Sequence, residues 1–151
     1  MSLRIKYWSI APDAHKSLRA VHEYLQGSTL EPVLIDLVYL RISQINGCGY
    51  CVDLHTSDAM KKGESFRRLN AVAAWHETPF FSAREQAAFA WAESLTRLPE
   101  TGAPDEVYEA LKPHFSEKEI VDLTYAIALM NAFNRLGVGF GRQPTNEPNA
   151  W

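Results

Sequence analysis

Cys48-Gly-Tyr-Cys51-Val-Asp-Leu-His55 holds both cysteines of this 151-residue chain. Residues three and four apart are neighbours on a helix, so positions 48, 51 and 55 fall on one helical face. Two thiols and an imidazole on one face could form a redox site or a metal site. Because Asn46-Gly47 interrupts the preceding apolar pattern, we expect the cysteines to lie in the first turns of a new helix.

The position of the cysteines predicts two effects that favour a thiolate. Unpaired N–H groups in the first turn of a helix attract negative charge, which helps Cys48 most. His55 follows Cys51 by one turn and could act as its base or ion-pair partner. The sequence does not rank these effects. Side chains at this spacing lie about 5–6 Å apart, and a disulfide needs about 3.5–4.5 Å between Cβ atoms. A first helical turn can deform to close that gap, so a reversible dithiol–disulfide cycle is feasible.

Three interpretations of the motif compete. Zinc would find three ligands in Cys48, Cys51 and His55, but a structural zinc site normally has four, and the sequence offers no second Cys-x-x-Cys or His-x-x-x-His. Inert packing is the second, because cysteines are often buried as small apolar residues. A thiol redox site is the third, and we favour it. The chain lacks the alternating strands and helices of a thioredoxin fold.

Asp36 lies among large aliphatic residues in Leu34-Ile-Asp-Leu-Val38. A buried carboxylate is costly unless it is paired. His55 is one candidate partner, and the alternatives are an ion pair with Arg41 or exposure to water. The remaining histidines show no mutual ligand spacing, so we expect them to be ordinary surface or core residues: His15, His22, His76 and His114.

The length and composition predict one globular domain over residues 1–151 with a substantial core. A net charge of −3 gives no reason to expect nucleic acid or an anionic membrane as a partner. No run reaches the roughly 18 apolar residues that span a bilayer, and the N-terminus lacks the features of a signal peptide. We therefore expect a cytoplasmic protein, in which a close cysteine pair is more often catalytic or metal-binding than structural.

The pattern of apolar and turn residues predicts an all-α protein, because no stretch shows sustained alternation bounded by turns. We expect helices over Asp13 to Leu25, Pro32 to about Ile45, the cysteine motif up to Gly63, Ser65 to Ala74, and Asp105 to Leu111.

Two capping boxes predict the starts of two further helices, at Ser82-Ala-Arg-Glu85 and Ser116-Glu-Lys-Glu119. The first of these helices should bury a stripe made of Ala88, Trp91, Leu95 and Leu98. The second is apolar on most sides and should lie in the core or in a subunit interface, through Ile120, Leu123, Ile127, Met130 and Phe133. After a core of about residues 32–136, we expect an irregular tail from Gly137 to Trp151.

The cysteine motif belongs to a longer segment, Leu40-Arg-Ile-Ser-Gln-Ile-Asn-Gly-Cys-Gly-Tyr-Cys-Val-Asp-Leu-His55, which is followed by Asp58-Ala59 and Gly63-Glu64. This segment resembles the core of the alkylhydroperoxidase D (AhpD)-like proteins of the carboxymuconolactone decarboxylase superfamily. Similarity extends to Trp75-His-Glu-Thr-Pro-Phe-Phe, Glu85-Gln-Ala-Ala-Phe-Ala-Trp-Ala-Glu-Ser-Leu-Thr96 and Asn131-Ala-Phe-Asn-Arg135. The resemblance covers most of the chain, from about Pro32 to Leu136.

The resemblance implies an AhpD-like helical fold with the Cys-x-x-Cys at the start of a central helix, assembled into trimers or hexamers. It implies thiol peroxidase chemistry without a metal or bound cofactor, in which Cys51 is oxidised to sulfenic acid and Cys48 resolves it as a disulfide. His55 would belong to a proton relay with a carboxylate on the preceding helix. Asp36 stands where the best-known members have glutamate, and Tyr50 stands where they have a histidine.

The leading hypothesis is therefore an enzyme that reduces hydroperoxides, with a dithiol or a redox protein as electron donor. True decarboxylases of the superfamily lack the cysteine pair as a working element, so its presence argues against that reaction. One alternative is a non-catalytic helical oligomer that binds a small ligand or a partner and uses the dithiol as a redox sensor. Another is a reductase of disulfides in other proteins.

Overall fold

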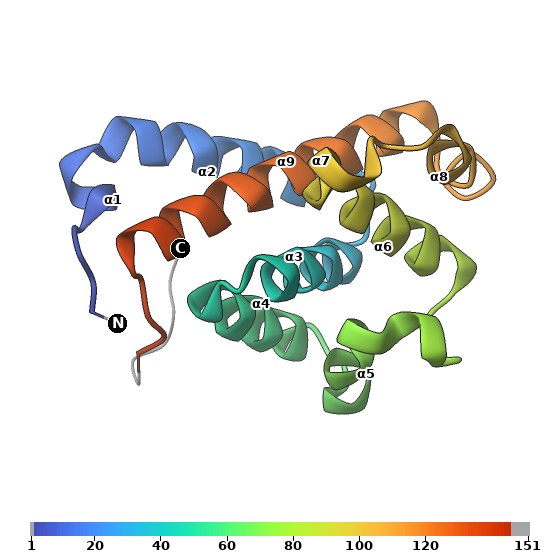
Figure 1. Ribbon diagram of the computed structural model, residues 1–151, viewed down its shortest axis with the longest axis horizontal. Coiled ribbons are helices and arrows are strands. Elements are labelled where there is room, and N and C mark those ends of the chain that lie inside the picture. Colours follow the sequence, from blue (N-terminus) through green and yellow to red (C-terminus); the bar gives the residue numbers. More distant parts are fainter. Residues whose placement is uncertain (1, 146–151) are drawn as a thin grey trace.

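The computed structural model describes residues 2–145, and all regular structure within them is helical (Figure 1). The elements are α1 (Tyr7–Ile10), α2 (Pro12–Gln26), α3 (Pro32–Asn46), α4 (Gly49–Lys61), α5 (Phe66–Ala71), the 3₁₀ helix η1 (Val72–Glu77), α6 (Ala83–Thr96), α7 (Leu98–Thr101), α8 (Asp105–Glu109) and α9 (Glu117–Phe140). The predicted all-α class is confirmed.

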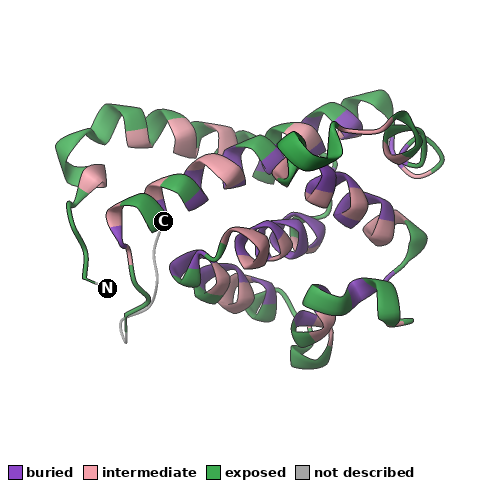
Figure 2. Cartoon of the chain, in the orientation of Figure 1, coloured by how far each residue is buried: buried purple, intermediate pink, exposed green. Residues whose placement is uncertain are grey.

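Helix α3 lies at the centre of the molecule and packs against α4, α6 and α9. It is buried on most sides, as Figure 2 shows, because its sequence is a nearly continuous run of large aliphatic residues. Helices α2 and α9 run alongside each other across one edge of the bundle (Figure 1). The central helix thus carries Asp36 into the core and ends directly before the cysteine motif.

Local sequence signals set several helix boundaries. Both capping boxes form, with Ser82 Oγ accepting from the Glu85 amide and Ser116 Oγ accepting from the Glu119 amide, each at 3.2 Å. Gly47 ends α3 in the left-handed conformation with φ of 67°, which glycine adopts without steric cost. All five apolar residues predicted along α9 are buried: Ile120, Leu123, Ile127, Met130 and Phe133. Ile127 thus packs within its own chain.

Other boundaries differ from the sequence-based expectation. The irregular tail was predicted from Gly137, but α9 continues to Phe140 and ends at Gly141. Packing of α9 overrides the intrinsic helix penalty of glycine, which is about 1 kcal/mol relative to alanine. The end of the expected tail, residues 146–151, lies outside the described residues. Leu98 falls beyond the end of α6 and is half exposed, so it does not extend the buried stripe of that helix.

The two remaining differences concern short helices. The helix expected from Ser65 to Ala74 is divided, because α5 ends at Ala71 and η1 contains the non-helical residue Ala74. Helix α1 was not predicted, since four residues are too few to show a periodic pattern.

The N-terminal arm, residues 4–10, lies against the end of α9. The Arg4 amide donates to the Phe140 carbonyl at 2.8 Å, and the Arg4 guanidinium donates to the Gly139 carbonyl at 3.0 Å. The Tyr7 ring stacks on Phe140 with centroids 5.2 Å apart. These contacts bring two regions from opposite ends of the sequence together beside the start of α4.

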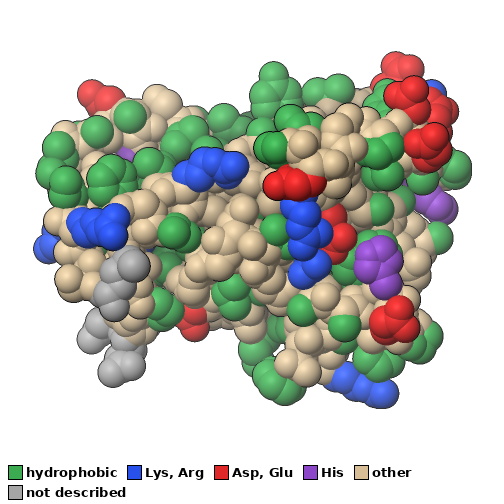
Figure 3. Space-filling model, viewed as in Figure 1, with side chains coloured by type: hydrophobic (Ala, Val, Ile, Leu, Met, Phe, Trp, Pro, Cys, Tyr) green, Lys and Arg blue, Asp and Glu red, His purple; other side chains and the backbone are tan. Residues whose placement is uncertain are grey.

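The face of the molecule in Figure 3 carries its charges unevenly. On the face in Figure 3, acidic side chains gather at the end where α8 and the start of α9 lie, whereas lysine and arginine side chains are scattered. None of the helices described in residues 2–145 has both the length and the apolar character needed to cross a bilayer.

Candidate functional site

Cys48 and Cys51 are joined by a disulfide with a Cα–Cα distance of 5.3 Å, so the expected proximity of the two sulfurs is present. Cys48 is the N-cap residue of α4, and its Sγ accepts a hydrogen bond from the Cys51 amide at 3.3 Å. The sulfur of Cys48 therefore meets an unpaired amide of the first helical turn, as its position in the sequence predicts.

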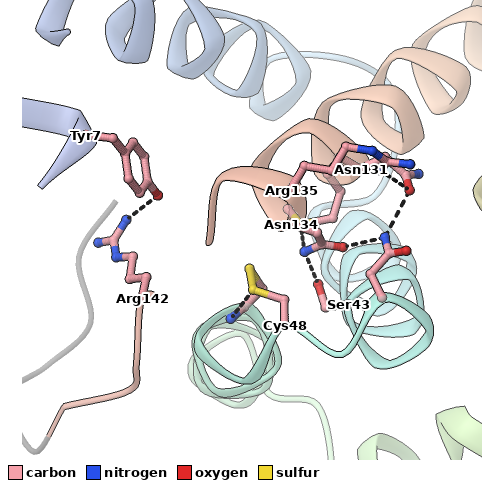
Figure 4. The surroundings of a disulfide bond; sticks show 10 residues. Tyr7, Ser43, Cys48, Asn131, Asn134, Arg135 and Arg142 are labelled. Atoms are coloured by element: carbon pink, nitrogen blue, oxygen red, sulfur yellow. Dashed lines mark hydrogen bonds between the residues drawn. A yellow bond between two sulfur atoms is a disulfide. The ribbon is translucent and has the colours of Figure 1, made fainter. Parts of the chain in front are cut away.

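A hydrogen-bond network holds the turn that precedes the cysteines. Asn46 Nδ2 donates to the side-chain oxygens of Asn131 and Asn134 on α9, at 3.0 and 2.9 Å. Asn134 Nδ2 donates in turn to Ser43 Oγ at 3.0 Å (Figure 4). Because Asn134 is buried, these bonds satisfy its amide and fix the end of α3 against α9. The network gives a structural reason for the asparagines in the Gln-Ile-Asn-Gly and Asn-Ala-Phe-Asn segments.

Cys51 faces a small pocket, and Cys48 does not line it. One side, here called the α4 wall, consists of Tyr50, Cys51, Leu54 and His55. The opposite side, here called the terminal wall, consists of Tyr7, His15, Met130, Phe133, Gly137 and Arg142. The free volume of about 20 Å³ is enough for about one water molecule. Cys51 is only 4% exposed, so little of its side chain meets solvent.

His55 is buried on α4 and completes the reactive side of the pocket. Its Nδ1 lies 3.9 Å from Asp36 Oδ1, and its ring meets the Tyr39 ring edge-on at 4.9 Å between centroids. Burial lowers the pKa of His55, and the carboxylate of Asp36 opposes this effect only in part. The imidazole is therefore neutral at neutral pH and able to accept a proton.

Asp36 is buried beneath His55 and forms an ion pair with Lys62 through its other oxygen, Oδ2. Of the partners considered from the sequence, His55 is near, whereas Arg41 instead pairs with Glu93 at 2.6 Å. Lys62 was not recognised as a site residue. Its only sequence signal was its place after α4, where lysine commonly complements the helix dipole.

Two histidines treated as ordinary lie at the site. His15 lines the disulfide pocket, and burial together with Arg142 and Arg19 lowers its pKa. His22 lies 6.0 Å from Tyr39 between ring centroids, and burial and the neighbouring His55 lower its pKa to about 4. Both belong to α2, seven residues apart and so on one face of that helix. This spacing of seven residues is the sequence signal that could have indicated that His15 and His22 face the same part of the molecule. Neither His76 nor His114 lines the pocket.

Arg142 lines the pocket and contacts residues on both of its walls. Its guanidinium carbon lies 3.8 Å from the centre of the Tyr50 ring and 4.5 Å from that of Trp8, which are cation–π distances. Its Nη1 also donates to Tyr7 Oη at 3.4 Å. Tyr7 and Arg142 lie on one side of the disulfide and the asparagine network on the other (Figure 4).

The site thus combines two sulfurs in bonding contact, a neutral imidazole and a buried carboxylate. This set can exchange electrons through sulfur and protons through the ring. Within residues 2–145, no group of three or more histidine, cysteine or acidic side chains is arranged to hold a metal ion.

Comparison with known proteins identifies the family of this chain. The model of the carboxymuconolactone decarboxylase family matches residues 12–94. Uncharacterized protein YdfG of Bacillus subtilis (strain 168) is 36% identical over 147 residues, which cover 97% of this chain and 100% of YdfG. The crystal structure of ATU0492 from Agrobacterium tumefaciens, a protein of unknown function described as a candidate antioxidant defence protein AhpD, is 41% identical with a TM-score of 0.93. That similarity covers 97% of this chain and 100% of ATU0492.

A more distant structure, the debrominase Bmp8, matches with a TM-score of 0.82 at 19% identity, over 93% of this chain and 75% of Bmp8. At that identity the match shows a common fold alone. The family model, YdfG and ATU0492 support a closer relationship. The chain belongs to the carboxymuconolactone decarboxylase family and has the AhpD-like fold.

Proposed function

We propose that the protein is a thiol-dependent peroxidase that reduces hydroperoxides through a Cys48–Cys51 dithiol–disulfide cycle. One observation carries the proposal: Cys51 and the His55 ring line the same small pocket, and the second sulfur, Cys48, is bonded to Cys51 outside it. In this arrangement Cys51 Sγ would react with the substrate in the pocket, and Cys48 Sγ, outside the pocket, would form the disulfide.

The cycle begins with the reduced pair. His55 accepts the proton of the Cys51 thiol, and the thiolate attacks the terminal oxygen of the hydroperoxide. The O–O bond breaks, Cys51 becomes a sulfenic acid, and the departing alkoxide takes the proton from His55 to leave as an alcohol. Sulfur loses the two electrons that the peroxide gains. The Cys48 thiol then attacks Cys51 Sγ and releases water, and an external dithiol reduces the disulfide.

Asp36 would orient His55 in this cycle. The separation of 3.9 Å between His55 Nδ1 and Asp36 Oδ1 exceeds a direct hydrogen bond. A small rotation of the ring or a bridging water would connect them. Lys62 holds the other carboxylate oxygen and so fixes the orientation of the Asp36 side chain.

The fold by itself does not select this reaction, because one fold supports different chemistries, and the debrominase Bmp8 shares the architecture. The bonded sulfur pair beside an imidazole is what favours peroxide reduction. We also propose a homo-oligomer, a trimer or a hexamer, which light scattering of the purified protein tests.

The decisive experiment follows consumption of cumene hydroperoxide by the purified protein with dihydrolipoamide as dithiol. Cys51→Ser should abolish turnover, and Cys48→Ser should allow a single round of oxidation without a disulfide. Turnover by Cys51→Ser at the wild-type rate would contradict the assignment. A wild-type protein that oxidises once, does not turn over and changes its assembly would instead be a redox sensor.

A further inference from the structure

Gly137 lies in the last turns of α9, beside the disulfide. A Cβ atom at this position would lie 3.0 Å from Cys48 Sγ and 3.7 Å from Cys51 Sγ. The first distance is tighter than ordinary contact, so Cys48 Sγ would have to give way by a few tenths of an ångström, and the second is ordinary van der Waals contact. Glycine inside a helix costs about 1 kcal/mol relative to alanine. Gly139, on the same helix, would place its Cβ in open space, so it provides a control for the helix propensity of alanine.

The oxidised and reduced pairs respond differently to a methyl group at position 137. In the disulfide, Cys48 Sγ is held by its bond to Cys51, and it also accepts the Cys51 amide hydrogen bond. Both contacts restrict how far Cys48 Sγ can move away while the bond exists. Once the bond is reduced, Cys51 no longer holds the Cys48 sulfur, and rotation about the Cα–Cβ bond of Cys48 can increase its distance from position 137. A methyl group would therefore disfavour the disulfide more than the dithiol.

We infer that Gly137 is a positioning residue for the resolving step, because its missing side chain keeps open the place that Cys48 Sγ occupies when the disulfide forms. In that step the Cys48 thiol attacks the Cys51 sulfenic acid, an S–S bond forms, and the S–O bond breaks. The thiol proton leaves with the hydroxyl group as water. The catalytic part of this inference rests on the proposed function, whereas the effect on the dithiol–disulfide equilibrium does not.

The equilibrium is tested without peroxide. Wild type, Gly137→Ala and Gly139→Ala are incubated in buffers of reduced and oxidised dithiothreitol, and the dithiol fraction is counted by alkylation and mass spectrometry. Gly137→Ala should shift the equilibrium towards the dithiol by about tenfold, which corresponds to about 30 mV for a two-electron couple. Gly139→Ala gains the same methyl group and should stay near wild type. Equal equilibria for all three proteins would overturn the inference.

A second measurement keeps the test valid if Gly137→Ala folds poorly when oxidised. Cys48→Ala removes the atom that would be crowded, and only the ordinary contact with Cys51 remains. In that background, Gly137→Ala should raise the thermal midpoint, as alanine normally does when it replaces a helical glycine. A lower thermal midpoint for Gly137→Ala in the Cys48→Ala background would mean that the methyl group clashes with atoms other than Cys48 Sγ, which would refute the role of Cys48.

The catalytic consequence is measured by trapping sulfenic acid with dimedone after one equivalent of cumene hydroperoxide. Gly137→Ala should show about tenfold more trapped Cys51 than Gly139→Ala, because resolution is slower. If the wild type does not consume peroxide but the equilibrium still shifts, the proposed function fails and the role of Gly137 stands. If the wild type consumes peroxide but Gly137→Ala leaves the dithiol–disulfide equilibrium unchanged, the proposed function stands and the role of Gly137 fails.

Discussion

The two walls of the disulfide pocket are built in opposite ways. The α4 wall comes from residues 50–55 of one helix, whereas the terminal wall draws on segments from Tyr7 to Arg142. The first is a local consequence of helical spacing, and the second depends on the meeting of the N-terminal arm, α2 and α9. Reactive groups are thus encoded in a short motif, while access to them is encoded by contacts between distant parts of the chain.

Lys62→Met tests the support behind the α4 wall and should have the largest effect. The buried Asp36 carboxylate would lose its ion-pair partner, whereas the neighbouring Lys61 pairs at the surface with Asp58. We expect the free energy of unfolding in guanidinium chloride to fall by about 1–3 kcal/mol in Lys62→Met. Lys61→Met, the matched control, should change it by less than about 0.5 kcal/mol. Equal losses in the two variants would show that the Lys62 pair does not support the wall.

Arg142→Ala opens the terminal wall by removing the guanidinium between Trp8 and Tyr50. Exposed cation–π contacts contribute about 0.5–1 kcal/mol each, so the barrier to opening should fall by about 1 kcal/mol, or about fivefold in rate. In a Cys48→Ser background, fluorescein maleimide should therefore label Cys51 about fivefold faster. The labelling rate of Cys51 with N-ethylmaleimide should rise less, because this smaller reagent needs a smaller opening. Arg135→Ala, a control on α9, should leave both rates unchanged, and an equal gain for both reagents would argue against a steric gate.

His22 tests whether α2 contributes to the α4 wall through charge, and its effect should be the smallest. A histidine with a folded-state pKa of about 4, against 6.5 ordinarily, stabilises the protein above pH 6.5. This contribution to the free energy of unfolding is lost as the pH falls from 6.5 to about 4, because in this range the unfolded chain binds more protons than the folded protein. With solvent screening, the loss is on the order of 1 kcal/mol.

Urea unfolding of wild type, His22→Gln and His114→Gln between pH 7 and 4 measures this contribution. The pH dependence should be weaker in His22→Gln than in the other two proteins. If the free energy of unfolding of His22→Gln depends on pH as strongly as that of the wild type, groups other than His22 govern the acid sensitivity.

The sequence predicts the α4 wall well and the terminal wall poorly, for physical reasons. Helical periodicity places Cys51 and His55 on one face of α4, which has Cys48 as its N-cap residue, and the capping boxes fix the starts of α6 and α9. The proximity of Asp36 to His55 was one of several possibilities. The ion pair between Asp36 and Lys62 joins residues 26 positions apart, which no periodicity indicates.

The terminal wall was missed because tertiary packing decides it. Glycine propensity suggested that the helix stops at Gly137, yet contact with the disulfide and the core carries α9 to Phe140. Arg142 fell within the expected tail, so nothing in the pattern connected it with Tyr50.

The narrowness of the pocket has a kinetic consequence. A space that holds about one water cannot admit an organic peroxide while Arg4 and Tyr7 keep the arm against α9. Each turnover would then require a displacement of the chain before any bond is made. If the protein reduces organic peroxides as proposed, we expect this motion to be the slow event, so that the rate follows solvent viscosity more closely than the strength of the oxidant.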